Sequence, residues 1–169
     1  MGGRGRGAAA GRHRRPQRAV RVPGAPGLIA VDTNILVYAH RRQAPQHEVA
    51  LAVLREVSTS SRSWGIPVFV VGEFVRLVTH PALFEYPSSL EDALEALGGL
   101  LQSRRARLLM PGRRYWAILR EVVIDGHATG NHMFDAQIAA VCLEHDVDTI
   151  LTEDRDFHRF SGLTVRRLT

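Results

Sequence analysis

The sequence predicts an α/β domain in which helices cover both faces of a central, mostly parallel sheet. Three observations lead to this prediction. Short apolar segments that read as buried strands alternate with longer segments whose apolar residues recur at helical spacing. Two of the strand segments, 28–31 and 149–152, run directly into acidic segments, as happens at the ligand-binding edge of open α/β sheets. The chain has 169 residues, of which 45% are hydrophobic, enough for one domain with a substantial core.

The first half of the domain is expected to hold one strand and four helices. The apolar run 28–31 is a buried strand that leads into a helical segment at 35–38. Apolar residues at helical spacing predict a helix over 46–57. Pro67 can occupy the first turn of the next helix, which extends to residue 78 before the His80-Pro81 break. Ser88 and Ser89 can cap a helix over 90–101, whose first turn is acidic.

The second half is expected to hold two helices and three short strands. Residues 107–110 are a strand that Pro111 and Gly112 end, and residues 113–124 and 134–145 have helical periodicity. The run 149–152 is a second buried strand, and residues 163–165 are an edge strand. Strands separated by helices favour parallel pairing, because each crossover returns the chain to the same end of the sheet.

Basic charge is concentrated at the start of the chain. Residues 1–27 contain seven arginines and no acid, whereas the remainder has 15 basic and 17 acidic residues. We expect residues 1–27 to be a disordered extension and residues 28–169 to form the domain. Two further interpretations of the extension are an arginine-rich RNA-binding arm and a translation start that lies nearer residue 22 or 28. The high pI belongs to this segment and is therefore no argument for nucleic-acid binding by the domain.

Several chemistries are excluded by composition and motif. All 22 basic residues are arginine, so the sequence offers no lysine for a phosphate loop, a Schiff base or a dehalogenase-type phosphatase. The sequence contains neither a GxSxG elbow nor histidines at zinc-site spacing. The single cysteine, Cys142, is expected to be a core side chain, which fits a reducing cytoplasm. No apolar stretch reaches the length of a membrane span, and we expect no membrane association.

Four acidic residues stand in contexts that suggest a common site. Asp32 and Asp154 each follow a buried strand, while Glu73 and Asp135 each interrupt an apolar helical segment. Each has a structural explanation: a helix cap for the aspartates and an ion pair with Arg76 for the glutamate. One site for a hard divalent metal explains all four together, because carboxylate oxygens are its preferred ligands.

In this order and spacing, these residues resemble the PIN-domain nucleases, and in particular the VapC toxins of bacterial VapBC toxin–antitoxin pairs. The resemblance runs from about residue 28 to the C-terminus. It rests on IAVDTNILVYAH, GEF, DAQIAA and LTEDRDFHRFSGL, found in that order along the chain. It implies a PIN-like three-layer α/β/α sandwich with a central, mostly parallel sheet.

The resemblance also implies the residues of the site. Asp32, Glu73, Asp135 and Asp154 would be the catalytic, metal-binding acids, with Mg²⁺ as the cofactor and Mn²⁺ as the alternative. Four further residues would support them: Thr33, Asn34, Thr152 and Asp156. Asp156 is the open position, since members of the family differ over which acid of the last motif faces the metal.

The function implied is a metal-dependent endoribonuclease that hydrolyses RNA with a metal-activated water. Arginines such as Arg41, Arg42, Arg113 and Arg114 could then hold the RNA backbone. The implied partners are RNA of the tRNA or rRNA class, a VapB-like antitoxin and a second copy of the chain in a homodimer. The alternative is a PIN-like module that binds RNA or acts as a scaffold without catalysis.

Overall fold

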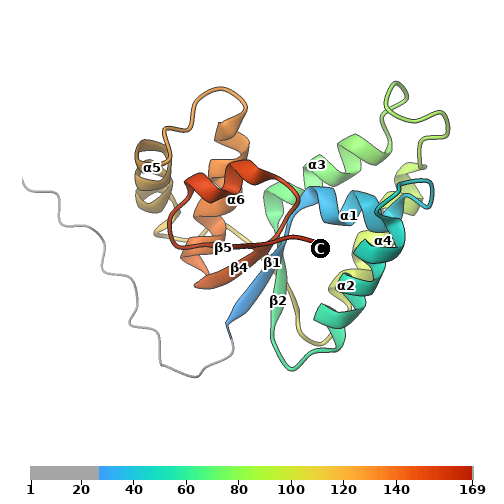
Figure 1. The fold of residues 1–169 in the computed structure, drawn as a ribbon, viewed down its shortest axis with the longest axis horizontal. Helices are drawn as coiled ribbons and strands as arrows, with labels where there is room; N and C mark the ends of the chain where they lie inside the picture. Colours follow the sequence, from blue (N-terminus) through green and yellow to red (C-terminus); the bar gives the residue numbers. More distant parts are fainter. Residues whose placement is uncertain (1–26, 169) are drawn as a thin grey trace, which may run out of the picture.

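The computed structural model describes residues 27–168, so the extension expected at residues 1–27 lies outside this range except for its last residue. Figure 1 shows a central sheet with helices packed on both sides, which confirms the predicted α/β architecture. The strands are β1 (Leu28–Val31), β2 (Trp64–Pro67), β3 (Ala106–Leu109), β4 (Val147–Leu151) and β5 (Thr164–Arg166). The helices are α1 (Thr33–His40), α2 (His47–Thr59), α3 (Val68–Val78), α4 (Leu90–Leu101), α5 (Tyr115–Asp125) and α6 (His132–Glu144), with a 3₁₀ helix, η1, at Arg155–Arg159.

The sheet has the strand order β3-β2-β1-β4-β5, and all of its strand pairs are parallel. The chain moves outward from β1 to β2 and β3, then crosses back to β4 on the other side of β1. Right-handed crossovers therefore place α1 to α4 on one face and α5 and α6 on the other, as Figure 1 shows. The direction of winding reverses between β1 and β4. The carboxyl ends of these two strands are therefore the switch point of the sheet, where parallel α/β folds bind ligands.

Strand β2 was not predicted. Its sequence, WGIP, contains glycine and proline, both of which are unfavourable inside strands, and it is only four residues long. All four residues are nevertheless buried between β1 and β3. A Cβ atom at Gly65 would lie 2.8 Å from the Leu109 side chain and 2.9 Å from the carbonyl oxygen of Arg107. The close approach of β3 therefore requires glycine, and tertiary packing prevails over local propensity.

The core is continuous across both faces of the sheet. Strand β1 is buried along its whole length, and Ile150 and Leu151 of β4 are fully buried beside it. Cys142 lies in the core on α6, as expected, and burial raises the pKa of its thiol. Within residues 27–168, no helix has the length and apolar character that a membrane crossing demands. A rigid, apolar sheet thus supports the polar side chains that follow its strands.

Candidate functional site

The candidate site lies at the carboxyl ends of β1 and β4, where the direction of winding reverses. Asp32 is the first residue after β1, and Thr152 is the first after β4. The backbone N–H of Asp32 donates to the carbonyl oxygen of Leu151 at 3.0 Å, so the two strand ends are held side by side. This is the edge of the sheet at which parallel α/β folds bind ligands.

Asp32 is almost completely buried, with 4% of its surface exposed, and each of its carboxylate oxygens accepts hydrogen bonds. The backbone N–H of Thr33 donates to Oδ1 at 2.7 Å, so Asp32 caps α1, as the sequence allowed. The Thr152 hydroxyl and the Asn34 amide donate to Oδ2 at 2.6 and 2.8 Å. These bonds fix the orientation of the carboxylate without using all of its lone pairs.

Burial raises the pKa of Asp32 from 3.8 to about 6. The hydrogen bonds from Thr152 and Thr33 oppose this effect, and the nearby charges of Glu73 and Asp135 add to it. The charged form of Asp32 is therefore destabilised in the metal-free protein. A buried carboxylate of this kind is stabilised by a cation, which is the electrostatic condition for a metal ligand.

The predicted supporting residues form a network beneath Asp32. The Asn34 amide nitrogen also approaches the Thr152 hydroxyl oxygen at 3.0 Å, and the Asn34 carbonyl oxygen accepts the backbone N–H of Glu153 at 3.1 Å. The Thr152 hydroxyl oxygen accepts the backbone N–H of Asp154 at 3.0 Å. Side chains from α1 thus position the loop after β4, although the two segments are far apart in the sequence.

Glu73 reaches the same region from α3. The Thr33 hydroxyl donates to Glu73 Oε2 at 2.7 Å, which places this carboxylate beside α1. Glu73 interrupts an apolar helical segment, but 37% of its side chain is exposed. The predicted ion pair with Arg76 is present at 3.7 Å between Oε1 and a guanidinium nitrogen, beyond hydrogen-bond distance. Glu73 therefore keeps oxygen lone pairs available for a further partner.

Asp135 lies in the first turn of α6, with 22% of its side chain exposed. The N-cap position of α6 is Asn131, without a side-chain capping bond, and Asp135 lies inside the first turn, so the cap explanation for Asp135 does not hold. Burial raises the pKa of Asp135 to about 6, the charge of Asp154 adds to this, and His132 opposes it. Smaller increases come from Asp156 and Glu73. The acids of four separate segments are therefore close enough to repel one another.

His132 joins the acidic residues and was not predicted as part of the site. Its Nδ1 atom lies 3.4 Å from Asp156 Oδ2 and 3.8 Å from Asp135 Oδ2. One ligand atom from each of these three side chains lies within 4.8 Å of the other two. Asp156 is additionally paired with Arg159 at 3.2 Å. His132 precedes Asp135 by three residues, so a shared helix face was the signal available in the sequence.

Asp154 has a structural role as well as an electrostatic one. Its Oδ1 atom accepts the backbone N–H of Asp156 at 2.8 Å and so caps η1. The cap holds the Asp156 side chain on the side of His132 and Asp135. Both acids of the last motif therefore lie at the candidate site. The charge of Asp154 raises the pKa of Asp135, and the Asp156 side chain contacts His132.

The donor set fits a divalent cation that prefers oxygen. Carboxylates dominate the set, and the region beside Asp32, Glu73 and Asp135 is acidic enough that a cation would relieve their repulsion. The imidazole of His132 is a borderline ligand, which Mn²⁺ tolerates better than Mg²⁺ does. The residues present therefore accommodate either ion, with the hydrogen bonds from Thr33, Asn34 and Thr152 orienting the carboxylates.

Two variants separate the cap from the charge at Asp154. We expect Asp154→Asn and Asp156→Asn each to lower any metal-dependent activity of the site by about 10–100-fold, the range seen when groups that support a metal are removed. Asparagine at position 154 can still accept the Asp156 N–H, so the cap survives while the charge is lost. Rates are compared at equal metal concentration, with Asp125→Asn, an exposed acid on α5, as the control. A wild-type rate for Asp154→Asn would reduce Asp154 to a cap and leave Asp156 as the fourth acid.

Comparison with known proteins gives one consistent family. The family model for the PIN domain matches residues 29–163. VapC ribonuclease Mb2897 of Mycobacterium bovis is 37% identical over 139 residues, which are 82% of this chain and 94% of that protein. Ribonuclease VapC25 of Mycobacterium tuberculosis is 28% identical over 136 residues, which are 80% of this chain and 95% of that protein. The matched region contains all four predicted acids.

Solved structures share the fold at lower identity. VapBC2 from Rickettsia felis, solved bound to a DNA fragment from its promoter, has a TM-score of 0.62 and 19% identity, covering 83% of this chain and 98% of that one. VapC20 of Mycobacterium tuberculosis, described as a sarcin–ricin loop cleaving toxin, has a TM-score of 0.58 and 18% identity, covering 80% of this chain and 98% of that one. At these identities the similarity concerns the fold.

Proposed function

This chain belongs to the PIN-domain family, and from its site we infer that it is a metal-dependent endoribonuclease that acts as the toxin of a toxin–antitoxin pair. The observation that carries the proposal is the convergence of Asp32, Glu73 and Asp135, with the acids after β4, at the point of the sheet where the winding reverses. A matched relative that the chain covers almost completely is named a VapC ribonuclease, which supports the same activity.

We propose that Asp32, Glu73, Asp135 and Asp154 hold Mg²⁺, or Mn²⁺ in its place, and that Asp156 and His132 complete the set. When bound, the metal activates water and stabilises the charge that develops on the phosphodiester. The protein's part is to hold these side chains still. Asp32 is fixed by Thr33, Asn34 and Thr152, and Glu73 is oriented by the Thr33 hydroxyl.

The substrate we propose is RNA of the tRNA or rRNA class. An acidic site repels a phosphodiester, so at least one cation from the protein should help to bring it in. Arg76 is suited to this role because it is 60% exposed and only loosely paired with Glu73. Arg41 is less suited, since its guanidinium donates to the Tyr86 carbonyl oxygen and stacks on Phe84, which ties it to the loop before α4.

The partners we propose are a VapB-like antitoxin and a second copy of the chain in a homodimer, with action in the cytoplasm. Structures of related fold include complexes named VapBC, which supports the antitoxin. A homodimer is checked by light scattering of the purified chain at micromolar concentration. The cytoplasmic location follows from the proposed substrates, which are found there.

Cleavage of RNA by the purified protein tests the activity. We expect a labelled RNA pool to be cut when Mg²⁺ or Mn²⁺ is added and to remain intact in excess EDTA, because the carboxylates repel the substrate and activate no water without a cation. Gel analysis of the fragments provides the measurement. Tight RNA binding without any cleavage in either metal would favour the alternative of a non-catalytic binding module.

A further inference from the structure

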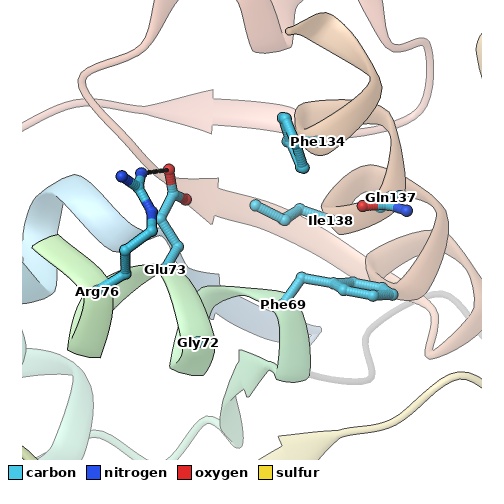
Figure 2. Close-up of a pocket in the computed structure, with 7 residues that line it drawn as sticks. All are labelled: Phe69, Gly72, Glu73, Arg76, Phe134, Gln137 and Ile138. Atoms are coloured by element: carbon cyan, nitrogen blue, oxygen red, sulfur yellow. Dashed lines mark ion pairs between the residues drawn. The ribbon is translucent and has the colours of Figure 1, made fainter.

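A pocket opens beside the acidic site, between α3 and α6 (Figure 2). Its volume is about 470 Å³, within the roughly 300–1,000 Å³ of small-ligand sites. One end holds the Glu73–Arg76 pair, and the other holds the Phe69 ring and the Gln137 amide, as Figure 2 shows. Phe134 and Ile138 form the α6 wall and Gly72 the α3 floor, so the pocket is mostly apolar with polar groups at both ends.

The pocket is continuous with the proposed catalytic site. Glu73 lines it and also accepts the Thr33 hydroxyl next to Asp32. Phe134 is the residue immediately before Asp135, and 64% of its surface is exposed although it is a large apolar side chain. A nucleotide that places its phosphate at the acids would therefore find this pocket as its nearest apolar surface. The pocket therefore adjoins the proposed site through Glu73.

Gly72 leaves part of the pocket floor without a side chain. It lies in the interior of α3, where glycine destabilises a helix by about 1 kcal/mol relative to alanine. A Cβ atom at this position would meet nothing within 4 Å, so packing does not require glycine there. The missing side chain is on the pocket floor, and any larger residue would project into the cavity. Gly98 and Gly99 of α4 are equally open helical glycines, so Gly72 is distinguished by its place in the pocket lining.

We propose that this pocket binds one nucleobase next to the scissile phosphate, so that residues of α3 and α6 select one base of the RNA beside the cut. The proposal rests on the ribonuclease activity proposed above. The exposed Phe134 ring provides a stacking surface for a base, and Phe69, itself packed on Tyr115 with ring centroids 6.0 Å apart, provides a second apolar wall. The Gln137 amide can donate to and accept from the edge of a base. Arg76 at the mouth is placed to pair with the adjoining phosphate.

A base within a duplex could not enter, because its faces are stacked and its pairing edge is occupied. The combination of aromatic walls, one amide and a guanidinium fits an unstacked base, whose faces and edge can use all of these groups, better than an aliphatic side chain, which can use only the apolar walls. The proposal therefore commits to nucleic acid as the occupant. A peptide of a protein partner and a second copy of the chain are tested as competing outcomes.

The test uses a pool of RNAs of about 12 nucleotides with random sequence, within the length range that single-strand sites cover. A sequence that the wild-type protein cleaves is resynthesised with one abasic nucleotide at each position in turn. We expect one abasic position near the cleavage site to lower kcat/KM by roughly tenfold or more, as base–aromatic stacking predicts. We call the kcat/KM of the intact RNA divided by that of the abasic RNA the abasic penalty. In Gly72→Leu, whose side chain fills the pocket, the intact RNA should be cut as slowly as the abasic RNA, so the abasic penalty should fall to about one. Phe134→Ala should also reduce the abasic penalty, because it removes a ring on which the base would stack.

Matched variants control for indirect effects. Gly99→Leu adds the same side chain to α4 at another helical glycine with open space, and should leave the abasic penalty unchanged. Trp116→Ala removes another exposed aromatic residue, on α5, and should likewise change nothing. Thermal unfolding shows that the variants are folded, and Gly72→Leu should be at least as stable as wild type because leucine favours the helix. Gln137→Leu should lose any preference for one base at the pocket position.

Four outcomes distinguish this proposal from the proposed activity. If wild type cleaves RNA but Gly72→Leu keeps the full abasic penalty, the pocket proposal fails while the ribonuclease stands. If wild type neither cleaves nor binds RNA, both fail. If Gly72→Leu cleaves like wild type but no longer binds a protein partner, the pocket is a partner site. If the same variant changes the mass measured by light scattering, the pocket belongs to a contact between copies.

Discussion

Replacing Asp32 with asparagine is expected to abolish RNA cleavage by the purified protein and to relieve any growth arrest that its expression causes. The substitution preserves shape but removes a buried charge that the proposed metal needs. We expect the cleavage rate to fall by roughly 1,000-fold or more, equivalent to about 4 kcal/mol of transition-state stabilisation. The measurement is the initial rate of cleavage at saturating Mg²⁺, alongside colony formation after induction.

The same variant should remain folded, and its stability gives a separate readout. Because the fold raises the pKa of Asp32 from 3.8 to about 6, the folded metal-free protein binds a proton that the unfolded chain has released. This contribution to stability is complete below the unfolded value and is lost as pH rises through about 6. In EDTA near neutral pH, Asp32→Asn should therefore unfold at the same or a higher temperature than wild type, with a smaller dependence on pH.

Asp125→Asn, an exposed acid on α5, is the control that should alter neither rate nor unfolding. A wild-type cleavage rate for Asp32→Asn would show that the assignment of the acids is wrong. A variant that is inactive because it is unfolded would be detected in the unfolding measurement and would say nothing about the metal. The two readouts together separate a lost ligand from a lost structure.

Co-expression with the product of a neighbouring reading frame is expected to restore growth, and the purified complex should be inactive even in ample Mg²⁺. The acids at the site are suited to bind an arginine of a partner, since a planar guanidinium binds carboxylates through two parallel hydrogen bonds and can take the place of a metal cation. We therefore expect the adjacent frame to encode a small protein with a DNA-binding N-terminal half. Its C-terminal segment would lie across the acidic cleft.

The measurement compares growth and RNA cleavage with and without this partner. Replacing the partner's arginines by glutamine, one at a time, should identify one whose loss restores cleavage in the complex. If no neighbouring frame encodes such a protein and expression of the chain alone is harmless, the toxin proposal fails, although a PIN-domain ribonuclease could survive.

The fold could be predicted because its information is local. Strand β1 is an uninterrupted apolar run and β4 ends in the buried pair Ile150-Leu151, and both lead into polar residues that the parallel sheet brings to one edge. The short strand β2 was missed because its glycine is explained by the approach of β3, which belongs to a distant part of the chain. Local propensity cannot report a requirement that arises only when two segments meet.

The candidate site also has residues that could be predicted from the sequence and residues that could not. Asp32 was recognisable from its place after a strand, and family resemblance related it to the other acids. His132 was overlooked because the histidines were checked only for the spacing of zinc sites. Its partner Asp156 lies 24 positions further along the chain and contacts it only in the folded protein. The pocket lined by Gly72 and Phe134 has no local signature at all, since each residue is unremarkable within its own helix.

The hydrogen bond from Thr152 to Asp32 also has a consequence for the synthesis of the protein. It joins residues 120 positions apart, one near the start of the domain and one near its end. Domains fold as the chain emerges from the ribosome, N-terminal part first, and long-range contacts form last. While the last motif is still inside the exit tunnel, Asp32 lacks this partner and the acids after β4 are absent from the cleft. A nascent chain whose last motif has not yet emerged therefore lacks a complete acidic site, and the proposed activity appears only after Thr152 has met Asp32.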